Sequence, residues 1–221
     1  MGKGKGKKFR NMVDEPTKLS WFRTHFNIPD DVTLVLAEEG AVGEGSPETA
    51  PFPIQSIVEG GIRFPINPLF RKFLHHCNLN PMQVSMNLIR VVNGVVELNR
   101  RLNLKLGIWE ILQVYSVNRH PIGTYFLRPR GDKVFVEGIT DSDKHAGHFF
   151  QVGGNFEYPP EITVRDHPLP RYFGQPGHRF SIVFSMLILI IIIFSVDLML
   201  TFLSYFSFCS EGIHSISPRF G

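Results

Sequence analysis

An almost wholly apolar run, SIVFSMLILIIIIFSVDLMLTFLSYFSF, occupies residues 181–208 and carries a single charge, at Asp197. A run of about 20 apolar residues spans the hydrocarbon core of a bilayer, and a buried helix of a soluble domain is rarely so uniform. We therefore expect a transmembrane segment over residues 180–208. Because no partner for Asp197 is visible in the sequence, we place it near an interface or at an early end of the span.

The charges on either side of this run predict its orientation. Arg171 and Arg179 precede it, whereas Glu211 and Arg219 follow it in a short tail over residues 209–221. The positive-inside tendency then places the preceding domain in the cytosol. The arrangement resembles a C-terminal tail anchor, with the membrane as the expected partner through residues 181–208.

The opposite end of the chain is basic and rich in glycine. Residues 1–20 are expected to form a basic disordered arm, because a stretch such as MGKGKGKKFR cannot bury an apolar face. The arm has no apolar run typical of a signal peptide. Nucleic acid and anionic lipid are its candidate partners, and a solvated terminus without a partner is the plainer alternative. The candidate contact residues are Lys3, Lys5, Lys7, Lys8 and Arg10.

Cysteine usage argues against disulfides and metal sites. Cys77 and Cys209 are the only cysteines in 221 residues, which excludes a disulfide framework and any multi-cysteine zinc module. His75, His76 and Cys77 are consecutive in a predicted helix, where neighbouring side chains diverge by about 100°. We expect no metal ion and no cofactor there.

Two Asn-Pro steps predict helix starts in the middle of the chain. In Asn67-Pro68 and Asn80-Pro81, asparagine is a favoured N-cap and proline fits the first helical position. Apolar residues at helical spacing then predict one helix after Pro68, with Cys77 on its buried stripe, and a longer helix after Pro81.

Other segments favour strands and turns. Helices followed by strands, without alternation of the two, indicate a compact α+β domain with a helical core and a small antiparallel sheet, over residues 21–160. The expected segments are a strand over 32–36, a loop over 37–53, a helix over 107–117 that buries Trp109 and Tyr115, a hairpin between 123–129 and 133–138, and a third strand over 148–154.

One turn has residues suited to binding a divalent ion. Asp141, Asp143, His145 and His148 lie close together in the sequence, but short acidic turns of this kind are usually solvated. The chain has no G-x-S-x-G elbow and no H-E-x-x-H motif. We therefore expect no catalytic residues and no enzyme.

Several blocks in order resemble a known family. They are IVEGGIRFPINPLFRKFLHHCNLNPMQVSMNLIRVVNGVVELNRRLNL, WEILQVYSV, GTYFLRPR and SDKHAGHFFQVGGNFEYP. This pattern is similar to the gypsy-type transposon domain of plant retroelement-associated proteins, which is transposase-like in name. The residues that match its pattern are Gly61, Arg63, Phe64, Pro65, Pro68, Phe70, Leu74, Pro81, Gln83, Asn87, Arg90, Tyr115, Ser142, Asp143 and Lys144.

The chain departs from the family pattern at two places. The family often has tryptophan where this chain has Ala146 or His148, and again where it has Phe156 before Glu157. The resemblance brings no catalytic residue and no cofactor with it. The reverse transcriptase, RNase H and integrase parts of a complete element are absent from this sequence.

The remaining hypotheses differ in how they treat the C-terminal run. Residues 161–179 are interpreted as a proline-rich linker. The first hypothesis is a non-enzymatic, mobile-element-derived structural or interaction protein with a membrane segment. The alternative is a nuclear, nucleic-acid-associated transposon protein whose hydrophobic tail is a degenerate gene end. Transposase or nuclease chemistry is suggested only by the family label.

Overall fold

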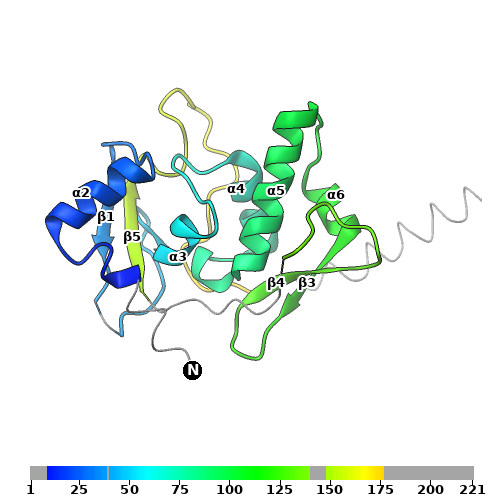
Figure 1. The fold of residues 1–221 in the computed structure, drawn as a ribbon, viewed down its shortest axis with the longest axis horizontal. Coiled ribbons are helices and arrows are strands. Elements are labelled where there is room, and N and C mark those ends of the chain that lie inside the picture. Colours follow the sequence, from blue (N-terminus) through cyan, green and yellow to red (C-terminus); the bar gives the residue numbers. More distant parts are fainter. Residues whose placement is uncertain (1–8, 39, 140–147, 177–221) are drawn as a thin grey trace, which may run out of the picture. The chain divides into compact units, whose positions relative to one another are not determined.

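The computed structural model describes residues 9–38, 40–139 and 148–176 (Figure 1). The chain divides into two compact units, residues 1–175 and 176–221. The elements of the first unit are α2 (Pro16–His25), β1 (Val32–Leu36), β2 (Ala50–Pro53), α3 (Ile54–Val58), α4 (Pro68–Cys77), the 3₁₀ turn η1 (Pro81–Gln83), α5 (Met86–Leu102), α6 (Ile108–Val114), β3 (Tyr115–Arg119), β4 (Tyr125–Pro129) and β5 (Phe149–Gly154).

The first described residues differ from the arm expected over residues 1–20. Phe9 and Val13 are buried, and α2 begins at Pro16. The helix packs through Phe22, which is fully buried with its ring centroid 5.6 Å from that of Phe150 in β5. Apolar residues at positions 9 and 13 therefore join the core although basic residues surround them.

The three-stranded sheet joins segments that lie far apart in the sequence. Its order is β1-β5-β2, antiparallel throughout, with Val32 opposite Gly154 and Ala50 opposite Val152. β1 has the bounds expected from sequence. β2 lies within the segment 37–53 that was expected to be a loop. Pro51 and Pro53 are typical of loops, and this is why the sequence does not predict a strand there. Proline is tolerated at a sheet edge, where its missing N–H breaks no ladder.

The hairpin forms with a different partner from the one expected. β4 pairs with β3, and Tyr115 lies opposite Pro129. The helix expected over residues 107–117 therefore ends at Val114. The segment expected as the second strand, 133–138, is held instead by the Tyr115 hydroxyl, which accepts hydrogen bonds from the N–H groups of Phe135 and Val136 at 2.9 and 3.3 Å.

The two long helices confirm the predicted starts in part. The Asn67 side chain accepts a hydrogen bond from the Leu69 N–H at 2.8 Å, so α4 is capped as expected. After Pro81 the chain makes only the turn η1. It then becomes extended at Val84, which bridges to Tyr125, and α5 starts with Ser85 as its N-cap.

The buried side chains confirm one helical stripe and correct one expectation. Phe70, Phe73, Leu74 and Cys77 of α4 are buried as predicted. Trp109, expected in the core, is 59% exposed. Arg71, which lies off the apolar stripe of α4, is nevertheless only 4% exposed. Arg71 is buried because a later segment of the chain covers that face of α4.

Most of that segment belongs to the linker expected over residues 161–179, and we call residues 159–174 the strap. It contains no helix or strand, yet Leu169 within it is 3% exposed. It is thus part of the domain, and the domain boundary expected at residue 160 lies later, near residue 175.

The fold class is α+β, as expected, but with two small antiparallel sheets. Within the three described ranges, no helix has both the length and the apolar character needed to cross a bilayer. The transmembrane segment expected over residues 180–208 lies outside those ranges.

Candidate functional site

The three consecutive residues weighed as metal ligands point to different surroundings. The His75 ring nitrogen Nδ1 lies 2.7 Å from the Pro168 carbonyl oxygen, while the His76 ring packs edge-on against Trp109. Cys77 is buried, and burial raises the pKa of its thiol to about 12. Burial also lowers the pKa of His76, and the charge of His75 adds to this effect. In the described part of the chain, no group of three His, Cys, Asp or Glu residues could hold a metal ion.

The other predicted candidates lie largely outside the described residues. This holds for the arm residues Lys3, Lys5, Lys7 and Lys8, and for Asp141, Asp143 and His145 of the acidic turn. Of the arm residues, Arg10 is described: it is partly buried, and its carbonyl accepts a hydrogen bond from the Val13 N–H. The His148 carbonyl accepts one from the Ile54 N–H, next to the start of β5.

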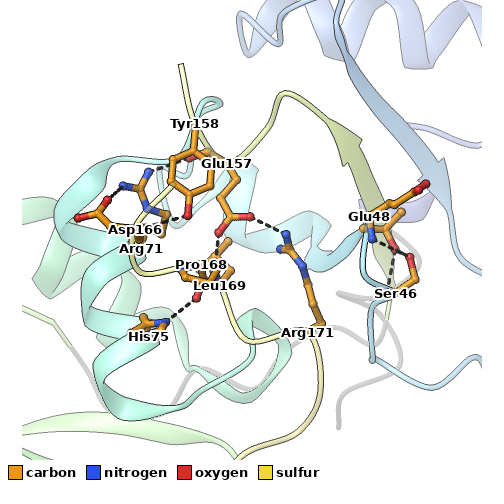
Figure 2. Close-up of polar contacts among 11 residues, drawn as sticks. Ser46, Glu48, Arg71, His75, Glu157, Tyr158, Asp166, Pro168, Leu169 and Arg171 are labelled. Carbon is orange, nitrogen blue, oxygen red and sulfur yellow. Dashed lines mark hydrogen bonds and ion pairs between the residues drawn. The ribbon is translucent and has the colours of Figure 1, made fainter. Parts of the chain in front are cut away.

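The described residues instead bring together a polar site around the strap, shown in Figure 2. At its centre is Glu157, which follows β5 and is 6% exposed. One carboxylate oxygen accepts a hydrogen bond from the Leu169 N–H, and the other pairs with the Arg171 guanidinium, each at 2.5 Å. A single buried carboxylate therefore holds the strap at two points.

Arg71 of α4 fixes the strap from the other side. Its guanidinium donates to the Glu157 carbonyl at 3.0 Å and lies 3.5 Å from a carboxylate oxygen of Asp166. It also lies over the Tyr158 ring, 4.0 Å from the centroid. The Tyr158 hydroxyl in turn donates to the Asp166 carbonyl. A charged side chain on the buried face of a helix thus finds partners about 90 residues later in the chain for its two terminal nitrogens, whereas its Nε is buried without a hydrogen-bond partner.

The end of the strap is fastened to η1 and to the loop before β2. The Asn80 side chain and the Gly45 N–H both donate to the Arg171 carbonyl, at 2.6 and 2.7 Å. The Gln83 amide makes two hydrogen bonds with the backbone of Gly174, at 2.8 and 2.9 Å. A side chain at position 174 would collide with the Asn78 carbonyl, so glycine is required there.

Beside the strap lies a hollow of about 480 Å³. Its lining includes Glu48, Asn155, Glu157, Tyr158, Arg165 and Arg171. Both carboxylate oxygens of Glu157 have partners, and burial, followed by the charge of Glu157, raises the pKa of Tyr158. These groups are therefore suited to holding the strap rather than to transferring protons.

The second notable feature is the separation of charge along the chain. Residues 11–60 contain two Lys or Arg residues and nine Asp or Glu residues. Residues 61–138 contain eleven Lys or Arg residues and four Asp or Glu residues. In Figure 1, α2 and β1 of the acidic part lie on the opposite side of the domain from α6 and the β3–β4 hairpin. One part of the surface thus favours anionic partners.

Exposed cations and apolar side chains meet where α5 ends. We call this group the basic patch, and it consists of Arg100, Arg101, Leu102, Leu104 and Lys105. Leu102 is 61% exposed and Leu104 is 43% exposed. Arg100 and Arg101 both contact Glu97, which leaves a net positive charge.

Sequence reasoning missed the strap and the separation of charge for different reasons. The strap has a proline-rich composition typical of a linker, and the buried partners of Arg71 are far from it in the sequence. A count of charges by segment could have found the charge separation. No protein family, curated protein or solved structure matches the chain.

Proposed function

We propose that the chain is a non-enzymatic, mobile-element-derived interaction protein whose cytosolic α+β domain is held at a membrane by a C-terminal segment. The observation that carries this proposal is the apolar run over residues 181–208, which begins a few residues after a domain ends. A compact unit that ends near residue 175 and an apolar run that starts at residue 181 suit a tethered domain.

The motif residues behind the family resemblance support a binding or structural role. Gly61 has a φ of 77°, Pro68 and Pro81 start α4 and η1, and Gln83 caps η1 and binds the strap. Each of these residues is explained by the backbone conformation that it permits or stabilises. The motif is therefore suited to specifying the fold rather than a reaction.

Carbonate extraction of cells that express the N-terminally tagged chain tests the membrane segment. A matched chain stopped at His178 serves as the control, because it keeps the strap and lacks the apolar run. We expect the full chain to remain in the membrane pellet and the stopped chain to be extracted. Extraction of both chains would contradict the proposal.

A second candidate function is a nuclear, nucleic-acid-associated protein in which the apolar tail has no role. The charge separation favours it, because a surface rich in Lys and Arg attracts phosphates. Candidate contacts are the basic arm and the basic patch. Retention on DNA at rising salt should then weaken on deletion of residues 1–8, and also in the triple variant Arg100→Gln, Arg101→Gln, Lys105→Gln.

Lys18→Gln is the control for that experiment, since Lys18 is an exposed cation in the acidic part of the chain, paired with Asp14 and Glu15. Each phosphate contact that is lost should reduce the slope of log affinity against log salt by about one. An equal effect of Lys18→Gln would point to net charge alone, and unchanged retention in all variants would argue against this second function.

A further inference from the structure

We propose that the surface formed by Val42, Tyr172 and Phe173 lies against the headgroup region of the bilayer and gives the domain a fixed orientation there. We call these three residues the exit surface. The inference rests on the proposed membrane segment. It goes further by naming the face of the domain that contacts the lipid.

The first argument is the length of chain beyond the strap. Because Gln83 holds Gly174 by two hydrogen bonds, the domain is fixed up to that residue. Residues 175–180 separate it from the apolar run. Six residues span at most about 20 Å when fully extended. The end of the domain that bears Gly174 therefore cannot move far from a membrane that contains residues 181–208.

The second argument is the exposure of large apolar side chains at this end. Tyr172 is 57% exposed, Phe173 is 50% exposed and Val42 is 66% exposed. Single exposed apolar residues are ordinary, but these three gather where the chain leaves the domain. Tyrosine is favoured at the membrane interface, where one end of the ring is apolar and the other is wet, and the Phe173 ring adds apolar area beside it.

The third argument is that the strap and the loop that carries Val42 are bonded to each other. The Phe173 N–H donates to the Glu44 carboxylate at 3.1 Å, and the Gly45 N–H donates to the Arg171 carbonyl at 2.7 Å. These bonds join the strap to the loop that carries Val42. Gly43 in the same loop lies so close to Met82 of η1 that a side chain there would crowd it. The exit surface is thus fastened to the core.

This orientation leaves the basic patch away from the membrane. α5 begins beside η1, and its 17 residues extend about 25 Å, so Leu102 lies at the far end of the helix from Gln83. The basic patch would then face the aqueous phase, where a soluble anionic partner can reach it. Contact between the basic patch and anionic lipid is the competing orientation.

The test uses the full chain reconstituted into vesicles of phosphatidylcholine and phosphatidylserine. An environment-sensitive fluorophore is attached at Tyr172→Cys or, as the matched control at a similarly exposed position, at Leu102→Cys. Both variants carry Cys209→Ser, and Cys77 is buried. We expect the label at position 172 to be quenched by lipid-borne quenchers. It should be several-fold less accessible to aqueous iodide than the label at position 102.

A second variant separates lipid contact from a local effect of the label. The label is moved to Val42→Cys, and Tyr172→Ser with Phe173→Ser removes the neighbouring aromatic rings. The label at position 42 should then become more accessible to iodide, whereas Leu102→Ser should leave the accessibility of that label unchanged. All three positions changed to serine are exposed, so the fold should tolerate these substitutions.

The possible outcomes distinguish this inference from the proposed function. If the chain is inserted but position 172 is fully accessible to iodide, the orientation is wrong and the membrane segment stands. Shielding at position 102 instead would assign the contact to the basic patch. Shielding that depends on the protein-to-lipid ratio would indicate a second copy of the chain and overturn the inference. Extraction of the full chain by carbonate would overturn both proposals.

Discussion

At the scale of single residues, two buried charges connect the ends of the domain. Glu157 and Arg71 are 6% and 4% exposed, and their partners are in or next to the strap. A charge removed from water is tolerated only with a counter-charge and hydrogen bonds. These residues therefore make the domain sensitive to changes at the strap.

Replacing Glu157 by Gln tests this sensitivity. The change leaves the Arg171 guanidinium largely buried without its counter-charge, so we expect a loss of about 2–4 kcal/mol in the free energy of unfolding. Urea unfolding measures it. The double variant with Arg171→Gln should lose less than the sum of the two single variants. Glu97→Gln, which breaks an exposed ion pair on α5, should cause no measurable change.

Cys77 offers a second test at this scale. Burial raises the pKa of its thiol to about 12, and the thiolate is the reactive form. In a chain with Cys209→Ser, we expect almost no alkylation of Cys77 at about pH 8 under native conditions and rapid alkylation in denaturant. Mass spectrometry follows the modification. Rapid native labelling would mean that α4 does not bury this side chain.

At the scale of elements, side-chain caps determine where the helices begin and end. Asn67 and Ser85 cap the starts of α4 and α5, and Asn78 and Asn103 end them in the left-handed region at φ of 51° and 50°. Asparagine tolerates that conformation better than most residues because its short side chain can bond locally. The two helices are thus bounded by local chemistry at both ends.

The N-cap of α4 gives a prediction with a matched control. Asn67→Ala removes the acceptor that binds the Leu69 N–H, so we expect a loss of about 1 kcal/mol in the free energy of unfolding. Asn67→Ser keeps an acceptor oxygen and should recover most of the loss. Denaturant unfolding compares the two variants. Equal losses in both would mean that packing of the Asn67 side chain, rather than the cap, is what matters.

At the scale of the whole molecule, the strap completes the domain. It covers one face of α4, reaches η1 and brings the end of the domain to the loop before β2. The buried Leu169 side chain adds apolar burial to these polar contacts. The domain therefore extends beyond the last strand, to about residue 175.

Two stopped chains test where the domain ends. A chain stopped after Pro176 keeps every described contact of the strap, whereas one stopped after Pro160 loses the burial of Leu169 and leaves Arg71 without Asp166. We expect the shorter chain to be less stable by about 3 kcal/mol or more. Thermal and urea unfolding measure the difference. Equal stability of the two would show that the strap contributes little.

Local physics allowed the sequence to predict several elements. Three features depend on residues within a few positions of one another: the N-cap and buried stripe of α4, the presence of a long amphipathic helix after Pro81, and the bounds of β1. Spacing and capping express such contacts directly in the sequence. The apolar run over residues 181–208 is likewise visible without a structure.

Tertiary contacts decided the features that local patterns could not. β2 has a loop-like sequence and becomes a strand because β5, about 100 residues later, pairs with it. β4 could pair with the segment before it, 115–119, or with the segment after it, 133–138. It pairs with the earlier segment, β3, while the Tyr115 hydroxyl accepts hydrogen bonds from residues 135 and 136 of the later one. Arg71 is buried because the strap covers it, and no spacing within α4 records that distant contact.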